Sequence, residues 1–174
     1  MKTLLTIVLF ISLGLCISCD LGLGINEPTE LEKLPPLTTS GENTFGCLVN
    51  GEAYIVTSAY NLVAMYQQGV LFIGGENNFK EISTHISLLV EDRIAEGEAF
   101  VLNTDTSPKG EYYTQSCFYS TSSKYSGRIE IAYFDTKGHI ISGTFEFMAT
   151  ANDACGNDEI MNISDGRFDM QYIP

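Results

Sequence analysis

The sequence predicts an all-β protein, a single antiparallel sandwich or barrel of about nine strands, preceded by a signal peptide and a flexible tether. Three observations predict this class. From Asn43 onward, apolar and polar residues alternate with a period of two, as they do in strands that bury one face. Turn residues separate these runs at short intervals. The 9 Tyr, 10 Phe and 16 Gly residues give a composition of strands and turns, and no segment has a strong helical period.

The positions of the strands follow from these runs and turns. Asn50-Gly51 and Gln68-Gly69 each separate two apolar runs and predict hairpins, because such residues tolerate the positive φ angles of tight turns. We predict strands at residues 44–49, 53–57, 62–67, 70–73, 82–90, 99–102, 111–120, 128–134, 140–150 and 166–173. In the run 140–150, one face should be core, and it consists of Ile141, Gly143, Phe145, Phe147 and Ala149. The pattern leaves the choice between sandwich and barrel open.

The N-terminus has the features of an export signal. Lys2 provides a positive charge, residues 4–15 are almost entirely apolar, and small Ser18 precedes Cys19. The run 16–19, Cys-Ile-Ser-Cys, resembles the bacterial lipobox, although Cys16 stands where Leu is usual. This resemblance implies a lipoprotein signal peptide at residues 1–18 and a lipid anchor on Cys19. The alternative, a C-x-x-C redox pair, is disfavoured because cleavage would remove Cys16 and acylation would block Cys19.

Residues 19–42 contain three prolines and a Thr-Thr-Ser-Gly run, and we expect them to be a lipid-anchored flexible tether. Residues 43–174 then form one all-β domain. The expected location is the cell envelope, where the protein is held in a membrane by its lipid. Asp20 resembles an inner-membrane retention signal of enterobacterial lipoproteins, but other phyla do not follow that rule, and we favour the outer membrane.

The chain is strongly acidic, and this excludes one class of partner. Lys and Arg total 9 against 22 Asp and Glu, and only Lys2 falls in the leader, so the chain from Cys19 has 8 against 22 and a formal charge of −14. Such a surface repels nucleic acid. The expected partner is the membrane, through the lipid at Cys19, and an additional glycan or protein partner stays open.

The sequence contains no established catalytic or metal-binding motif. The two histidines, His85 and His139, are isolated, and neither lies at a metal-ligand spacing. No Gly-x-Ser-x-Gly elbow and no phosphate-binding glycine loop occurs. We therefore predict no catalytic residue, no metal site and no cofactor.

Four carboxylates deserve separate mention because paired acids hydrolyse glycosidic bonds. They are Glu130, Glu146, Asp165 and Asp169. The competing explanation is that Glu130 and Glu146 alternate with apolar neighbours and so belong to the solvated face of a half-buried strand. Their arrangement in space distinguishes the two: convergence in a concave pocket would favour a hydrolase.

Two further groups of residues could bind ligands. The loop 152–159 concentrates oxygen atoms that could bind calcium, but the EF-hand order is absent and a solvated turn is favoured. The other group presents aromatic rings suited to a sugar or a peptide, and consists of Tyr112, Tyr113, Tyr119 and Tyr125. Tyr112 and Tyr113 must point to opposite faces of their strand, so at least one of them should be core.

Two end motifs carry a resemblance to a known family. The opening run 43–51, Asn-Thr-Phe-Gly-Cys-Leu-Val-Asn-Gly, and the closing runs 141–145 and 165–169, ending in Asp-Gly-Arg-Phe-Asp, are similar to a family of small Bacteroidetes lipoproteins with a C-terminal domain of unknown function. The similarity spans residues 43 to 172. The family has no assigned activity, and so the resemblance implies none.

The resemblance also bears on the cysteines of the domain. Three remain beyond the anchor, Cys47, Cys117 and Cys155, so at most one internal disulfide forms. The family places cysteines at its two ends, which implies a disulfide between Cys47 and Cys155 and leaves Cys117 as a buried apolar residue. The predicted function is a membrane-anchored lipoprotein with a non-catalytic binding or accessory domain, and the alternative is a carboxylate-based glycan hydrolase.

Overall fold

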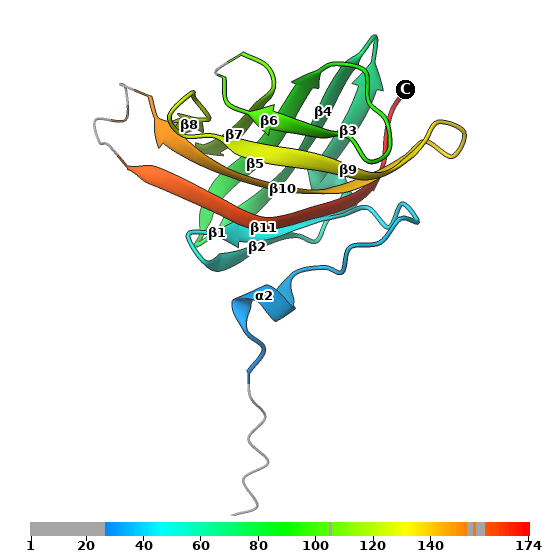
Figure 1. Cartoon of the computed structure of the whole chain (residues 1–174). Coiled ribbons are helices and arrows are strands. Elements are labelled where there is room, and N and C mark those ends of the chain that lie inside the picture. Colours follow the sequence, from blue (N-terminus) through cyan, green and yellow to red (C-terminus); the bar gives the residue numbers. More distant parts are fainter. Residues whose placement is uncertain (1–26, 105, 153–154, 156–158) are drawn as a thin grey trace, which may run out of the picture.

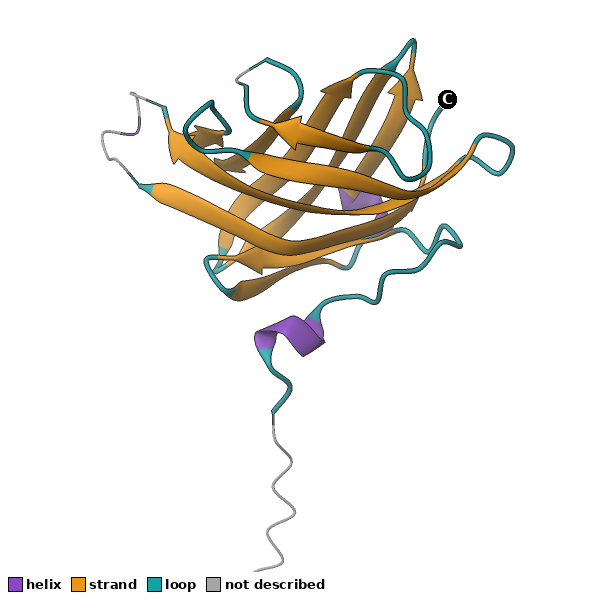
Figure 2. Cartoon of the chain, viewed as in Figure 1, coloured by secondary structure: helices purple, strands orange, loops and turns teal. Residues whose placement is uncertain are grey.

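The computed structural model describes residues 27–104, 106–152, 155 and 159–174. Most of this part is β-strand, and the strands form one antiparallel sheet that curls into a nearly closed barrel (Figures 1 and 2). The all-β prediction is confirmed, and of the two architectures the barrel is present. The predicted signal peptide and Cys19 lie outside the described residues. Within the described part, no helix has the length and apolar character needed to span a membrane.

In the part of the chain that the structure describes, the sheet contains eleven strands. In chain order these are β1 (Thr44–Val49), β2 (Glu52–Val56), β3 (Leu62–Gln67), β4 (Val70–Phe79), β5 (Ile82–Glu91), β6 (Ala99–Leu102), β7 (Lys109–Thr114), β8 (Phe118–Ser120), β9 (Gly127–Asp135), β10 (Ile140–Ala151) and β11 (Ile160–Gln171). Their spatial order is β2-β1-β11-β10-β8-β7-β5-β4-β3. Strand β9 shares the edge of β10 with β8, and β6 pairs with the far side of β9 (Figure 1).

The end of the chain helps to close the barrel. Met65 of β3 forms a parallel bridge with Ile173, just beyond β11. Two backbone hydrogen bonds hold this bridge, one from Tyr66 to Ile173 and one from Ile173 to Ala64, each 2.9 Å long. The last residues of the chain therefore pair with β3, the strand at one end of the sheet order.

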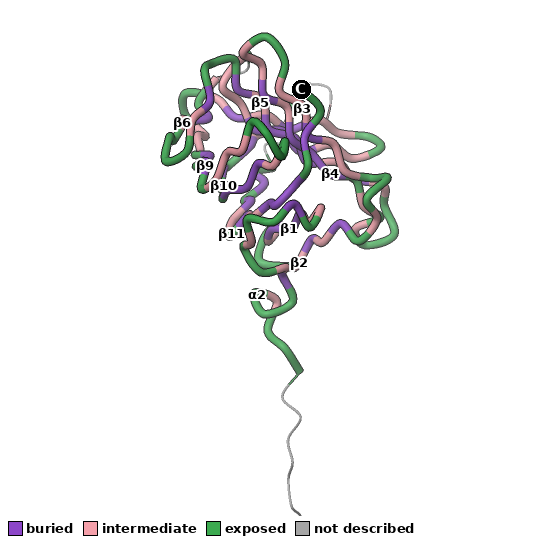
Figure 3. Tube along the Cα trace, turned by 90° about the vertical axis from the view of Figure 1, so that its right-hand side faces the viewer, coloured by how far each residue is buried: buried purple, intermediate pink, exposed green. Residues whose placement is uncertain are grey.

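The barrel interior is filled by the side chains that the period-two pattern predicted. In β10, Ile141, Phe145, Phe147 and Ala149 are all at most 3% exposed. Phe45 of β1 stacks on Phe145 with 5.2 Å between ring centroids. Figure 3 shows buried positions along the strands and exposed positions at the turns. Because side chains occupy the interior, ligand sites are to be sought on the outer surface.

Three strands differ from the prediction by more than two residues. Strand β4 continues to Phe79, six residues beyond the predicted end at residue 73. The predicted strand 111–120 is two strands, β7 and β8, because a tight turn separates them: the Thr114 backbone N–H donates to the Cys117 carbonyl (2.8 Å), and the Cys117 N–H donates to Thr114 Oγ1 (2.9 Å). Strand β11 begins six residues earlier than predicted, at Ile160. Its first half contains Asn162, Ser164 and Asp165, whose polarity hid the pattern from the sequence.

The expectation of a flexible tether up to residue 42 is wrong for residues 27–42, which we call the strap. The strap contains the short helix α2 (Glu30–Lys33), which Thr29 and Glu32 close with a capping box. Leu34 is only 6% exposed. The strap thus packs against the barrel instead of leading freely away from it (Figure 1).

Asp169 of β11 is the main attachment point of the strap. The carboxylate is fully buried. It accepts hydrogen bonds from Thr38 Oγ1 (2.6 Å) and from the backbone N–H groups of Ser40 (3.1 Å), Gly41 (2.9 Å) and Glu42 (3.2 Å). One of the four candidate catalytic acids is therefore occupied by a structural role.

Candidate functional site

Two grooves lie on the outer surface of the barrel. The first, which we call the His85 groove, lies over β4, β5 and β7 and has a volume of about 410 Å³. It is lined by Phe72, Glu76, Ser83, His85, Ser87, Glu111, Tyr113, Thr114 and Gln115. The second, the Glu146 groove, lies over β9, β10 and β11 with a volume of about 470 Å³.

Strand register creates the hollow of the His85 groove. Gly74, Ser87 and Glu111 form one row across three strands, and Glu76, His85 and Tyr113 form the next row. Gly74 and Ser87 have small side chains, so the surface of the sheet is lower along the first row than along the second row, whose side chains are large. A Cβ atom at Gly74 would lie 2.8 Å from the Ile86 carbonyl oxygen and 3.1 Å from two atoms of the His85 ring. The position therefore requires glycine.

Glu111 is a buried acid on this outer face, and it is held by three donors. Lys109 Nζ lies 2.5 Å from Oε1, while the Tyr113 hydroxyl (2.8 Å) and Ser87 Oγ (3.2 Å) donate to Oε2. The Glu111 side chain is 7% exposed. A buried carboxylate is costly unless it is paired and hydrogen-bonded, and these partners meet that requirement. The network fixes the orientation of Tyr113 in the groove wall.

Burial and the Glu111 carboxylate both change the pKa of Tyr113. Burial raises the pKa of its hydroxyl, and the hydrogen bond to Glu111 and the charge of that group raise it further. Tyr113 is therefore a hydrogen-bond donor at physiological pH and not a phenolate. Its ring packs against Phe118 of β8, with centroids 4.7 Å apart.

His85 is a polar group of the groove that is available to a ligand. Its ring lies 5.9 Å from that of Tyr113, and within the described part of the chain its imidazole makes no hydrogen bond. Burial lowers the pKa of His85, while the charges of Glu76 and Glu111 oppose that change. The neutral ring, which predominates at pH 7, offers a ligand one donor and one acceptor nitrogen.

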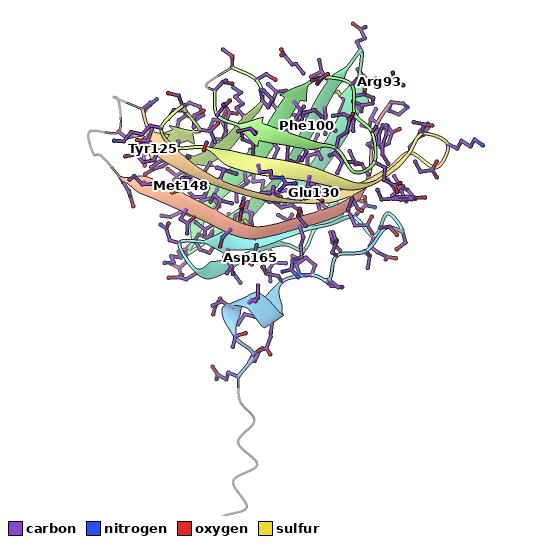
Figure 4. The ribbon with its side chains drawn as sticks, viewed as in Figure 1. Arg93, Phe100, Tyr125, Glu130, Met148 and Asp165 are labelled. Atoms are coloured by element: carbon purple, nitrogen blue, oxygen red, sulfur yellow. The ribbon has the colours of Figure 1, made fainter. Side chains whose placement is uncertain are left out.

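The Glu146 groove contains three of the four acids that the sequence singled out. Its lining consists of Leu37, Arg128, Glu130, Thr144, Phe145, Glu146, Asp165, Gly166 and Arg167. A smaller hollow of about 200 Å³, which also contains Glu146, continues it toward Met148. Figure 4 shows Glu130, Met148 and Asp165 over the same three strands. The convergence that would favour a hydrolase is thus present for three acids, whereas Asp169 lies under the strap.

These three acids are exposed and accompanied by arginines. Glu130 accepts from Arg128 Nη2 at 2.9 Å, and its side chain is 47% exposed. Glu146 lies opposite Arg128 in the sheet register, and Asp165 accepts a hydrogen bond from Ser164. Glycoside hydrolysis needs one carboxyl group that keeps its proton near neutral pH, a property that burial creates. None of the three acids has such surroundings.

The predicted Cys47–Cys155 disulfide is absent, and all three described cysteines are free. Cys47 is fully buried in β1, where burial strongly raises the pKa of its thiol. Cys155 Sγ donates to Asn152 Oδ1 (3.1 Å) and lies 4.0 Å from the Phe118 carbonyl oxygen, and its interaction with Cys117 raises the pKa of the Cys117 thiol. The structure therefore places Cys155 next to β8, where the Asn152 N–H donates to the Phe118 carbonyl at 3.0 Å.

The other predicted residues are scattered. His139 is exposed in the turn before β10, beside Tyr172. Tyr112 is core and Tyr113 points outward, as the alternation predicted. Tyr119 is buried and donates to Glu159, while Tyr125 lies under Lys124. Of the loop 152–159, Asp153 and Asp158 lie outside the described residues, and the described residues contain no cluster of three metal-binding groups.

Sequence reasoning missed Glu111, Ser87 and Lys109. The alternation does place Lys109, Glu111 and Tyr113 on one face of β7. Their proximity to His85 and Ser87 depends on the register between β5 and β7, which no local signal specifies.

Comparison with known families gives one match: the family described as a domain of unknown function (DUF6252) matches residues 42–170. No curated protein matches the chain. No solved structure matches it either.

Proposed function

We propose that this chain, which belongs to the DUF6252 family, is a cell-envelope lipoprotein that is anchored by lipid on Cys19 and binds an envelope glycan without converting it. One observation carries the proposal: the His85 groove combines aromatic walls with a fixed polar network and a histidine free to bond a ligand. Our preferred location is the outer membrane.

The chemistry of the groove suits a sugar. A pyranose ring presents apolar C–H faces that pack on aromatic rings, and Phe72 and Tyr113 supply such surfaces. Its hydroxyl groups both donate and accept, and the neutral imidazole of His85 and the carboxylate of Glu76 match them. A few fixed polar groups among aromatic walls are the usual composition of a small-ligand site. The acidic surface disfavours an anionic ligand.

The same groove is poorly equipped for catalysis. Glu111 is already engaged by Lys109, Tyr113 and Ser87, so neither Ser87 nor Glu111 is available as a nucleophile or a base. A fixed network of this kind holds a site in shape, and this favours binding over reaction.

The short segment between Cys19 and the strap supports the proposal of a lipid anchor. Only residues 20–26 separate Cys19 from the described chain, and seven extended residues span at most about 25 Å. A lipid on Cys19 would therefore hold the barrel close to the membrane surface. Two or three acyl chains, each contributing about 0.8 kcal/mol per buried CH₂, give persistent anchoring.

Binding is tested with the full-length protein in a detergent that contains no sugar. The probes are soluble N-acetylglucosamine oligosaccharides, measured by titration calorimetry, and purified peptidoglycan, measured by co-sedimentation. We expect His85→Ala to weaken binding at least tenfold. His139→Ala, which removes the only other histidine and lies outside both grooves, is the matched control. Equal binding by the wild type and His85→Ala, or no binding to either probe, would contradict the proposal.

A second candidate function, glycan hydrolysis, is favoured by the three acids of the Glu146 groove. The assay is release of soluble dye from dye-labelled peptidoglycan by the wild type and by Glu146→Gln. Release by the wild type that is lost in Glu146→Gln would establish this alternative and displace non-catalytic binding. We expect no release from either protein.

A further inference from the structure

We propose that Cys117 and Cys155 form a disulfide bond that fastens the loop after β10 to the turn between β7 and β8. Two observations place the residues together. Cys155 lies close enough to Cys117 to raise the pKa of the Cys117 thiol. In addition, Cys155 Sγ lies 4.0 Å from the carbonyl oxygen of Phe118, the residue that follows Cys117.

Backbone contacts explain why the two cysteines meet. Ala151, at the end of β10, pairs with Tyr119 of β8. The next residue, Asn152, donates its backbone N–H to the Phe118 carbonyl at 3.0 Å. Cys155 then donates its own N–H to the Asn152 carbonyl, also at 3.0 Å, which keeps Cys155 near β8. Main-chain hydrogen bonds of Asn152 and Cys155 thus hold Cys155 near the residue that follows Cys117.

Cys47 is a poor competitor for either partner. It is fully buried in β1, and the groups that interact with it electrostatically are the core tyrosines Tyr54 and Tyr112. A bond from Cys47 to Cys155 would require the Cys155 loop to enter the packed interior or β1 to leave it. Neither movement is needed for the Cys117–Cys155 bond.

The reaction is a thiol–disulfide exchange with a two-electron oxidant, and we name as oxidant the disulfide of an envelope thiol oxidoreductase. One thiol of the pair loses its proton and attacks that disulfide, which forms a mixed disulfide and releases one thiolate of the oxidant. The second thiol loses its proton and attacks the mixed disulfide. The Cys117–Cys155 bond forms, and the oxidoreductase leaves with both sulfurs reduced and, overall, the two protons. An oxidising compartment follows from the export that the proposed function assumes.

The bond would also stabilise the wall of the His85 groove. Cys117 ends the turn that begins at Thr114, a lining residue of that groove. Phe118, next to Cys117, packs against Tyr113. Fixing Cys117 therefore restricts the turn and the aromatic pair beside it.

The test begins with full-length protein extracted from its native envelope with alkylating agent and no reductant. We expect a Cys117–Cys155 linked peptide by mass spectrometry, with Cys47 unmodified in the native state. Reduction should lower the melting temperature by about 10 °C, as expected for closing a loop of this length. Cys155→Ser should melt like the reduced wild type and show no further change on reduction.

A second arm separates the pairing from the export assumption. Full-length protein reduced in vitro is re-oxidised with oxidised glutathione and mapped again. Formation of the Cys117–Cys155 bond supports the pairing even if protein taken from cells is reduced, a result that would contradict export instead. Alkylation of both Cys117 and Cys155 after re-oxidation, or a linked peptide that contains Cys47, would overturn the proposal. Cys47→Ala is the matched control and should keep its reductant-dependent melting shift.

Discussion

Replacing Asp169 by Asn should release the strap, because the buried carboxylate holds it by four hydrogen bonds. Oδ2 accepts from Thr38 Oγ1 and from the N–H groups of Ser40 and Glu42, and Oδ1 accepts from Gly41. The asparagine amide has almost the same volume but only one acceptor oxygen, so its NH₂ group must face at least one N–H donor. The charge that strengthens the remaining bonds is also lost.

The size of the effect follows from these contacts. A hydrogen bond to a charged group contributes about 1.5–3 kcal/mol, and a neutral one about 1 kcal/mol. With one bond lost and three weakened, we expect docking of the strap to lose about 2–4 kcal/mol, because such terms are not additive. A tenfold change corresponds to about 1.4 kcal/mol, so opening of the strap should increase at least about thirtyfold.

Trypsin cleavage after Lys33 measures this opening. Lys33 is exposed, but the next residue, Leu34, is buried against the barrel, so cleavage requires the strap to open. Asp165→Asn is the control, because Asp165 lies on the same strand, is exposed, and its carboxylate accepts only from Ser164 among the described residues. Equal cleavage rates in Asp169→Asn, Asp165→Asn and the wild type would refute the role assigned to Asp169.

Two other predictions concern the anchor and pH. Cys19→Ser should abolish incorporation of labelled palmitate and move the protein out of the outer-membrane fraction; label incorporated into the variant would exclude Cys19 as the lipid site. The pKa of His85 is lower in the folded protein than in the unfolded chain, where it is about 6.5. Between these two pKa values the unfolded chain binds more protons than the folded protein. The contribution of His85 to stability is therefore complete above pH 6.5 and is lost as the pH falls below it. Urea unfolding at pH 7.5 and pH 5 should show a smaller decrease for His85→Gln than for the wild type, and an equal decrease would contradict this assignment.

Local signals predicted the strands well where a turn or an apolar face was strong. Asn50-Gly51 correctly ended β1, and the alternation in β10 correctly identified its core face. The strap was missed because its proline-rich composition is that of a linker, while its attachment depends on Asp169, more than 120 residues away. No local propensity reports such a contact.

The candidate site was less predictable for the same reason. His85, Tyr113 and three acids were noted individually, but a groove is a property of neighbouring strands. Gly74 illustrates this point: in the sequence it is one of 16 glycines, and only the register against β5 shows that a side chain there would collide with the His85 ring. The position of Cys155 next to β8 likewise depends on the pairing of β8 with β10.

The strap lines only one of the two grooves, and this allows the two candidate functions to be separated. Leu37 of the strap lines the Glu146 groove, whereas no residue of the strap lines the His85 groove. Opening the strap by Asp169→Asn should therefore remove one wall of the Glu146 groove and leave the His85 groove intact. If the barrel binds its glycan through His85, Asp169→Asn should keep the wild-type affinity while its strap is cleaved rapidly. If Asp169→Asn instead binds glycan more weakly than the wild type and its strap is also cleaved rapidly by trypsin, the ligand occupies the Glu146 groove. The assignment of binding to His85 is then wrong.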